Sequence, residues 1–442
     1  MIVNTEFGKI EGLTSEAGYS FLGVPFAAPP VDELRFKPPQ LPSRWSGVRR
    51  CQEYSAIAPQ PHLGNITPLK LRNPQSEDCL YLNIFAPHNA RNLPVMFWLY
   101  GGGFVAGTAN MPIYNGINLA SEQNVIVVTI NYRVGILGFC GENFGLMDQV
   151  AGLNWVKNNI ISFGGDPNNI TVFGESAGAS SIDALMREPD VSGLFQRAIC
   201  QSGTLDTVRV IFASSGKLNI TKNADIDDLL AEQSITFGWD DDKYVCQPRE
   251  CGEKYWNPVP LLIGWNNNEE TIFTSNCNPE DFERWSERMF NAEFTRAVMA
   301  RYEDPKTAWN AVIRYAGFAL PARTMAEKIA TLDQPVYFYR FKREAPEVRY
   351  AKHLKCYHSS EISYVFGNAL TPPSAEDQLL SKQMMSYWTN FARTGDPNDS
   401  ALPKWPQWHA NERRNIILDV PISSESDCAK TECDFFASLG QR

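Results

Sequence analysis

The sequence predicts an α/β fold in which helices flank a central, mostly parallel β-sheet. Short runs rich in Val, Ile and aromatic residues alternate along the chain with stretches that have helical spacing. This alternation is typical of βαβ units. Most of the runs are apolar at nearly every position, which is the pattern of strands that are buried on both faces of a parallel sheet.

The first part of the chain is expected to form short strands and loops. Gly8 and Gly12 divide residues 2–26 into short strand-like runs. Prolines are dense in residues 25–44, and because proline lacks a backbone N–H, this segment is predicted to be irregular. Residues 59–76 are polar, contain proline and carry no Trp, Tyr or Phe, so a loop is expected there.

From residue 80 onward, predicted strands and helices alternate. Strands are expected at 80–86, 94–100, 125–130, 170–173, 197–201, 260–263, 336–341 and 416–418. Helices are expected at 119–123, 147–163, 177–187 and 376–393, where helix-forming residues or a repeating apolar stripe occur. Residues 206–259 have mixed charge and are predicted to be a helical insertion over the sheet. No internal repeat or boundary between domains is visible, so we expect one domain over residues 1–442.

Composition excludes several classes of function. The net charge is −10 and no basic stripe stands out, which disfavours nucleic-acid binding. The sequence lacks an apolar stretch of about 18 residues, and its start is neither basic nor strongly apolar; we therefore expect no membrane segment and a cytoplasmic location. The ten cysteines are scattered without a Cys-x-x-Cys pair, so reduced thiols and no metal site are expected.

The stretch 170–187 carries the strongest chemical signal. A β-branched and aromatic run at 170–173 leads into Gly174-Glu175-Ser176-Ala177-Gly178, and a helix-like segment follows. This is the nucleophile-elbow pattern, in which a sharp turn from strand to helix exposes one serine at the top of a sheet. Ser176 is the candidate nucleophile.

A serine nucleophile needs a base and an orienting acid. Three histidines follow Ser176 in the chain, at positions 353, 358 and 409. The acid is expected in a loop after a strand, and the polar run that follows residues 260–264 offers Glu269 or Glu270. The residues alone leave both choices open.

The reaction also requires donors for a developing oxyanion. Gly101, Gly102 and Gly103 follow a predicted buried strand and present backbone N–H groups that no side chain obstructs, as in the glycine-run loop of lipases and esterases. Ala177 supplies another N–H at the start of the predicted helix. Each such donor contributes about 3 kcal/mol to transition-state stabilisation.

Motifs along nearly the whole chain resemble those of the type B carboxylesterase family, which includes the cholinesterases, and in particular its bacterial para-nitrobenzyl esterase type. They lie at 21–27 (FLGVPFA), 76–83 (SEDCLYLN), 100–104 (YGGGF), 131–133 (NYR), 145–149 (GLMDQ), 163–167 (FGGDP) and in the elbow. The resemblance implies an α/β-hydrolase fold with helical insertions. It also implies a serine carboxylesterase that acts on small-molecule esters through an acyl-enzyme intermediate, without a cofactor or metal.

The resemblance also implies roles for individual residues. Ser176 matches the nucleophile, and Gly102, Gly103 and Ala177 match the oxyanion hole. Glu269 matches the acid within Gly-x-Asn-x-Asp-Glu-Gly, although Glu270 stands where the family has its final glycine. His358 matches the base in His-x-x-Glu-Ile-x-x-Val-Phe-Gly. A non-catalytic binding protein of this family, and an amide, carbamate or lactone hydrolase, are the alternatives.

The resemblance implies two structural ion pairs, and the sequence departs from the family pattern in several places. The resemblance implies structural pairs of Arg35 with Glu77 and of Arg133 with Asp166. The family disulfide that would use Cys79 lacks its partner, because Ala58 stands before Pro59-Gln60; a shifted bridge to Cys51 is left open. The loop 59–76 lacks the choline-binding Trp of cholinesterases, so recognition of a quaternary ammonium there is not expected. The segment between Ser176 and Glu269 is shorter than usual, which changes the wall of the pocket.

Overall fold

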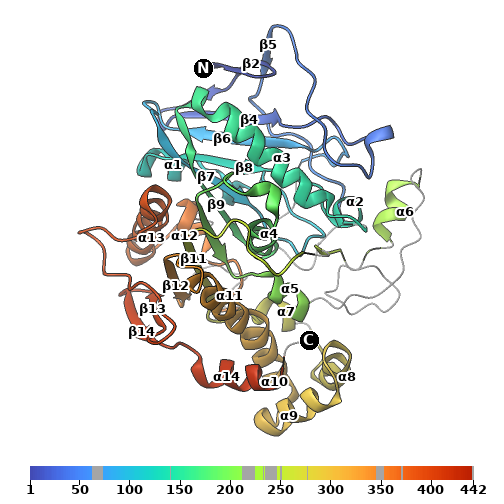
Figure 1. Cartoon of the computed structure of the whole chain (residues 1–442), viewed down its shortest axis with the longest axis vertical. Helices are drawn as coiled ribbons and strands as arrows, with labels where there is room; N and C mark the ends of the chain where they lie inside the picture. The colour runs from blue at the N-terminus through green and yellow to red at the C-terminus, as the bar shows by residue number, and fades with distance from the viewer. Residues whose placement is uncertain are drawn as a thin grey trace.

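The structure is a computed structural model that describes residues 1–61, 73–139, 141–211, 224–231, 233, 246–248, 251–275, 277–344, 353–369 and 372–440. Two sheets are present within these residues. The smaller sheet has the order β1-β2-β5, formed by β1 (Ile2–Thr5), β2 (Gly8–Glu11) and β5 (Val48–Arg50). The larger sheet forms the centre of the molecule (Figure 1).

The larger sheet has eleven strands in the order β14-β13-β12-β11-β10-β9-β7-β8-β6-β4-β3. Pairing is parallel from β8 through to β13 and antiparallel at the two ends. The predicted α/β fold with a mostly parallel sheet is therefore confirmed. The strands are β3 (Leu13–Thr14), β4 (Tyr19–Pro25), β6 (Tyr81–Ala86), β7 (Leu93–Leu99), β8 (Ile126–Ile130), β9 (Gly165–Glu175), β10 (Arg197–Gln201), β11 (Leu261–Asn266), β12 (Val336–Phe341), β13 (Arg414–Leu418) and β14 (Ser423–Ser426).

Helices cover both faces of this sheet (Figure 1). On one face, α13 (Ala375–Thr394) packs on β7 and β9, and α1 (Ile117–Gln123) packs on β6 and β8. On the same face, α12 (Ile362–Phe366) packs on α13. The group on the other face packs on strands β9 to β12 and comprises α3 (Phe144–Asn159), α4 (Ala177–Met186) and α11 (Leu320–Ala330). Each strand between the groups is buried on both faces, as the apolar runs of the sequence require.

The remaining helices lie around these two layers. They are α2 (Gly135–Phe139), α5 (Leu205–Ile211), α6 (Ile226–Ala231), α7 (Thr271–Thr274), α8 (Phe282–Met289), α9 (Ala292–Tyr302), α10 (Pro305–Ala311), the π-helix Val312–Ala319 and α14 (Lys430–Ser438). The α5 and α6 segments support the expectation of a helical insertion over 206–259, although much of that insertion lies outside the described residues. Outside that insertion, helices α2, α7 to α12, α14 and the π-helix were not predicted from the sequence.

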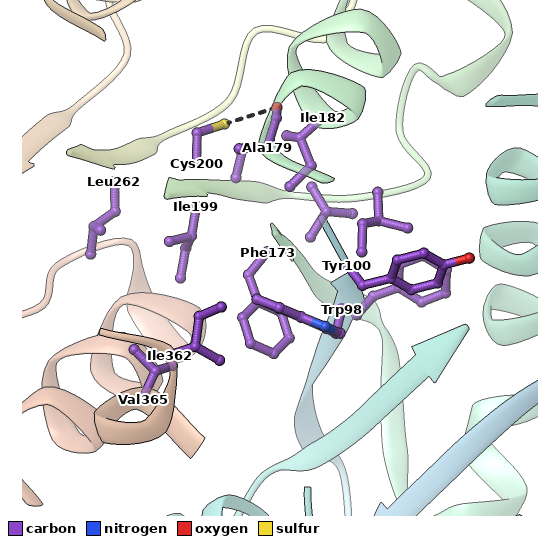
Figure 2. Close-up of a cluster of buried hydrophobic side chains, with 14 of the residues drawn as sticks. Trp98, Tyr100, Phe173, Ala179, Ile182, Ile199, Cys200, Leu262, Ile362 and Val365 are labelled. Carbon is purple, nitrogen blue, oxygen red and sulfur yellow. Dashed lines mark hydrogen bonds between the residues drawn. The ribbon is translucent and has the colours of Figure 1, made fainter. Parts of the chain in front are cut away.

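The core on the two faces of the central strands is shown in Figure 2. Cys200 on β10 points toward α4, where its thiol donates to the Ala179 carbonyl over 3.8 Å, while the neighbouring Ile199 points to the opposite face. On that face the ring of Trp98 packs against Phe173 at 4.8 Å. Large side chains pack on both faces of β9 and β10, and this packing positions the end of β9 at Glu175.

Candidate active site

Ser176 lies at the junction between the end of β9 and the start of α4. Its backbone is strained, with φ +56° and ψ −122°, because a non-glycine side chain crowds the backbone at positive φ. The Ser176 N–H donates to the Gln201 carbonyl over 2.8 Å, which anchors the turn to β10. The sharp turn predicted from the sequence is present, and its serine is half-buried.

Two glycines allow the elbow to pack closely on the neighbouring strand. A Cβ at Gly178 would lie 2.0 Å from the Leu99 carbonyl oxygen on β7, and one at Gly174 would lie 2.7 Å from the same atom. Both distances are too short for a side chain, since real Cβ atoms do not approach closer than about 3 Å. Helix α4 therefore rests directly on the backbone of β7.

His358 and Glu269 are in direct contact. The imidazole Nδ1 of His358 lies 2.5 Å from Oε2 of Glu269, and both side chains are buried. The other oxygen of Glu269 accepts the N–H of Asn266 over 2.6 Å. Glu269 lies in the turn that follows β11, the position expected for the acid. An acid held at Nδ1 keeps the imidazole oriented with Nε2 available for a reacting proton.

The structure separates the alternatives that the residues left open. Glu270 points away from the imidazole, and its carboxylate binds Arg314. His353 and His409 are both exposed. Glu269 and His358 are thus the acid and the histidine that the fold brings together.

The second imidazole nitrogen faces a different carboxylate. Nε2 of His358 lies 3.1 Å from Oε1 of Glu175, the residue before the nucleophile. The distance is within ion-pair range, but Nε2 makes no hydrogen bond to any residue that the structure describes, so the two groups are close without hydrogen-bond alignment. Ser359 donates to the same Glu175 oxygen over 2.5 Å. Ser176 is likewise not hydrogen-bonded to Nε2 here, and such contacts often form only when substrate binds.

Three buried carboxylates surround the imidazole and change its protonation. Burial lowers the pKa of His358, but Glu175, Glu269 and Glu361 more than offset this and raise the pKa to about 9. Burial raises the pKa of Glu175 to about 8, although the nearby His358 favours its charged form. The pKa of Glu361 is also raised by burial and by Glu269.

Glu361 links the site to the sheet and to the helix layer behind it. Gln201 Nε2 donates to one of its carboxylate oxygens over 3.0 Å, and Asn266 Nδ2 donates to the other over 2.5 Å. The indole N–H of Trp388 on α13 donates to the side-chain oxygen of Gln201 over 3.0 Å. Glu175, Glu361 and Gln201 were not among the site residues predicted from the sequence. Glu175 and Glu361 lie inside the two motifs that were recognised, which is where a signal for them was available.

Aromatic rings cover the imidazole. The ring centroids of Phe318 and Phe273 lie 4.9 and 5.2 Å from that of His358. Such packing limits the rotation of the imidazole and excludes water from the bond between His358 and Glu269.

The glycine run after β7 lies against the elbow. A Cβ at Gly101 would lie 2.8 Å from Cβ of Ser176. Gly102 and Gly103 both have positive φ, at +127° and +61°. The N–H groups of Gly102, Gly103 and Ala177 donate to none of the residues that the structure describes, which leaves three backbone donors beside Ser176.

An apolar cluster borders these donors. It contains Ala177 and side chains from the glycine-run loop, α2, α4, α5 and the insertion. Its rings include Phe104 and Phe139, whose centroids are 5.0 Å apart. The buried members are Phe104, Val105, Ala106, Ile136, Leu137, Phe139, Leu146, Ala177, Ala184, Leu205, Val208, Leu229 and Cys246.

One expected ion pair is confirmed and the other is wrong. Arg35 binds Glu77 with Nε and one terminal nitrogen, as expected. Arg133 binds Asp148 on α3, with contacts of 2.8 and 2.7 Å, and not Asp166. Asp148 is fully buried and needs a cationic partner, whereas Asp166, at the start of β9, accepts the N–H of Asn168.

Cys51 and Cys79 are both buried free thiols, so the shifted disulfide is not formed. Most of the loop 59–76, at residues 62–72, lies outside the described residues, and the absence of an aromatic ring there remains an observation on the sequence. No cluster of three or more His, Cys, Asp or Glu side chains suited to a metal ion occurs within the described ranges. In those ranges there is also no helix with the length and apolar character that crossing a membrane requires.

Comparison with known proteins gives a consistent result. The model of the carboxylesterase family matches residues 1–225 and 213–436. Para-nitrobenzyl esterase of Bacillus subtilis (strain 168) is 35% identical, over 96% of this chain and 96% of its own length. Pyrethroid hydrolase Ces2e of Rattus norvegicus is 34% identical over 95% and 86% of the two chains, and acylcarnitine hydrolase of Mus musculus is 33% identical over 95% and 87%.

Solved structures show the same similarity. A thermophilic PNB esterase superposes with a TM-score of 0.86 at 32% identity, covering 99% of each chain. A second PNB esterase structure superposes with a TM-score of 0.84 at 32% identity and the same coverage. The similarity extends over the whole length of both proteins.

Proposed function

Because this chain belongs to the carboxylesterase family and is a carboxylic ester hydrolase, we propose that it acts through a Ser176–His358–Glu269 triad and an acyl-enzyme intermediate. The observation that carries the proposal is the 2.5 Å contact of Glu269 with Nδ1 of a buried histidine whose other nitrogen is free of hydrogen bonds to the described residues. The strained elbow presents Ser176 at the same edge of the sheet.

In the first half-reaction, Ser176 Oγ attacks the ester carbonyl carbon and its proton passes to Nε2 of His358. The carbonyl oxygen becomes negative, and the N–H groups of Gly102, Gly103 and Ala177 stabilise it. When the tetrahedral intermediate collapses, the bond to the alcohol oxygen breaks and His358 returns its proton to that oxygen. The alcohol leaves and the acyl group stays on Ser176.

In the second half-reaction, a water molecule replaces the alcohol. His358 takes one proton from the water, whose oxygen attacks the acyl carbon, and the same backbone donors stabilise the oxyanion. The bond to Ser176 Oγ then breaks, and Oγ recovers its proton from His358. The products are the carboxylic acid and the free enzyme.

Glu269 stabilises the imidazolium that forms in both steps. Its contact with Nδ1 also leaves Nε2 as the nitrogen that carries the transferred proton. Nε2 lies 3.1 Å from Oε1 of Glu175 and makes no hydrogen bond with Ser176, so the Ser176 side chain must turn toward Nε2 when substrate binds. Loose geometry before substrate binding is common in such sites.

The substrates that the site fits are small esters with an apolar acyl or alcohol part. The apolar cluster that includes Ala177 and Phe104 packs beside the oxyanion donors, and apolar surroundings of this kind favour apolar groups on a ligand. The names of the relatives refer to para-nitrobenzyl esters, pyrethroids and acylcarnitine, and these guide the choice of a test panel. The free thiols of Cys51 and Cys79 favour a reducing compartment, which supports a cytoplasmic location.

The test of the triad is the Ser176→Ala variant with para-nitrophenyl butyrate as substrate. We expect kcat to fall by at least about 10⁴-fold, because the oxyanion donors alone provide only residual catalysis. A fluorophosphonate probe should label the wild-type protein and not the variant. Ser192→Ala, at an exposed serine, is the control and should keep full activity and labelling. Retained hydrolysis by Ser176→Ala would exclude Ser176 as the nucleophile, and failure of the probe to label the wild type would favour a binding protein.

A further inference from the structure

Glu270 departs from the family pattern next to the proposed triad acid. A glycine is usual at this position, but this chain carries a carboxylate whose side chain is only 2% exposed. A carboxylate buried to this extent is costly unless a cation and hydrogen bonds compensate it. A second carboxylate directly after Glu269 therefore requires a dedicated partner.

Arg314 is that partner. Its Nε donates to Oε2 of Glu270 over 2.8 Å, and a terminal nitrogen donates to Oε1. The two parallel bonds form a bidentate pair, the most directional contact that an arginine makes with a carboxylate. Burial lowers the pKa of Arg314, but Glu270 more than offsets this, so the pKa is raised. The guanidinium also lies 5.6 Å from the ring centroid of Tyr315.

Arg314 belongs to the π-helix Val312–Ala319, which also carries Phe318. The ring of Phe318 packs on His358 with 4.9 Å between centroids. One irregular segment thus contacts the turn that carries Glu269 and Glu270, here called the acid turn, through Arg314. The same segment contacts His358 through Phe318. A π-helix is rare and is frequently found at functional sites.

The acid turn has further contacts on two sides. Thr274 donates to the side-chain oxygen of Asn310, at the end of α10, over 2.7 Å. On the other side, Thr271 donates to the Leu354 carbonyl over 2.9 Å, and the Asn268 N–H donates to the Cys356 carbonyl over 3.0 Å. These contacts join the turn to the loop of His358. The Arg314–Glu270 pair adds a charged contact from the π-helix that directly follows α10.

We propose that Arg314 is a positioning residue that acts through Glu270 to hold the turn carrying Glu269 against His358. The inference rests on the proposed triad. Arg314 touches none of the reacting atoms, and its effect is on geometry: a displacement of about 1 Å at a catalytic group lowers the rate by about 100-fold. Loss of the pair should therefore act on kcat and leave substrate binding almost unchanged.

The test compares Arg314→Met, Glu270→Gln and the double variant with wild type, using para-nitrophenyl butyrate. Arg314→Met should lower kcat at least tenfold with KM within twofold, and it should lower the thermal unfolding midpoint because Glu270 is left buried and unpaired. The double variant leaves no unpaired charge, so its unfolding midpoint should return toward that of wild type. Its kcat should stay low, since the bidentate contact is still missing.

Arg35→Met is the control, because Arg35 also forms a bidentate pair with a largely buried carboxylate, Glu77, which is 17% exposed against 2% for Glu270. It should lower the unfolding midpoint without changing kcat. If Arg314→Met keeps wild-type kcat, or if the double variant recovers kcat together with stability, the inference is wrong. If Arg314→Met does not fold, the kcat of the folded double variant decides in the same way. Because Ser176→Ala tests the triad separately, failure of the triad proposal and failure of this inference give different results.

Discussion

At the scale of single residues, the site concentrates negative charge around one imidazole. Glu175, Glu269 and Glu361 are all buried near His358. An imidazole must be neutral to accept a proton. Because nearby carboxylates stabilise the charged imidazole, its pKa rises, and it becomes active as a base only at higher pH. An isolated histidine would titrate near its ordinary value of about 6.5, whereas the pKa of His358 is raised to about 9.

We therefore expect kcat/KM for para-nitrophenyl butyrate to keep rising above pH 7, with an acid limb centred above 6.5. Glu175→Gln should shift this limb to lower pH, because it removes the carboxylate nearest to Nε2 while the amide can still accept from Ser359. The measurement is a pH profile of kcat/KM from pH 5 to 10. Glu122→Gln, at an exposed glutamate, should leave the profile unchanged. A wild-type limb centred at 6.5 or below would contradict the expected effect of the carboxylates.

Residue types in the sequence pointed to Ser176 because a nucleophile elbow has a local pattern. Glu269 and Glu270 could not be separated by residue type or spacing, since both follow β11 in the same polar turn. Only the fold shows that one faces Nδ1 and the other faces Arg314. The catalytic roles of Ser176, His358, Glu269, Gly102, Gly103 and Ala177 stay predictions until the variants are measured.

At the scale of elements, the elbow depends on how closely α4 approaches β7. Gly178→Ala would place a methyl group 2.0 Å from the Leu99 carbonyl oxygen, and the helix must move to relieve this. We expect a loss of about 1–3 kcal/mol in stability, measured by urea unfolding, together with a lower kcat. Gly252→Ala is the control, because nothing lies within 4 Å of its added Cβ; its effect should stay within about 0.5 kcal/mol. Equal stability of the two variants would contradict the proposed close packing.

The elements predicted from the sequence are those with a clear period or a continuous apolar run. Strand β12 has the bounds predicted for it, 336–341. Helix α13 (Ala375–Thr394) extends one residue beyond its own predicted bounds, 376–393, at each end. The helices from α8 to α11 were missed, although Asn291 and Asp304 cap two of them. Helices α8 to α10 pack on one another through aromatic rings such as those of Trp285 and Trp309, whose centroids are 5.2 Å apart. Their burial therefore depends on tertiary neighbours that a short sequence window does not contain.

At the scale of the whole molecule, one apolar core includes residues from Val3 to Phe436. This favours the single domain expected from the sequence, which stays a prediction. The mostly parallel sheet was predictable because strands buried on both faces have continuous apolar runs. The resemblance implied Asp166 as the partner of Arg133, and only the fold shows that the guanidinium meets the buried Asp148 instead.

The thiols provide a prediction for the whole molecule. Cys51 and Cys79 are unpaired in the structure, so stability should not depend on a cross-link between them. Alkylation of the denatured protein without prior reduction, followed by mass spectrometry, should find both cysteines modified. The thermal unfolding midpoint should be the same with and without dithiothreitol. A cross-linked peptide containing both residues would contradict the free thiols.

The order of strands in the large sheet also sets a length scale for catalysis. Ser176 follows β9 and Glu269 follows β11, with β10 between them. Neighbouring strands are about 4.8 Å apart, so the two ends are separated by about 10 Å, a gap that one imidazole ring and its two hydrogen bonds can bridge. The backbone ladder of the sheet therefore sets the span of the proposed Ser176–His358–Glu269 triad. Substitutions in the pocket can change which ester is accepted, but they leave this span unchanged.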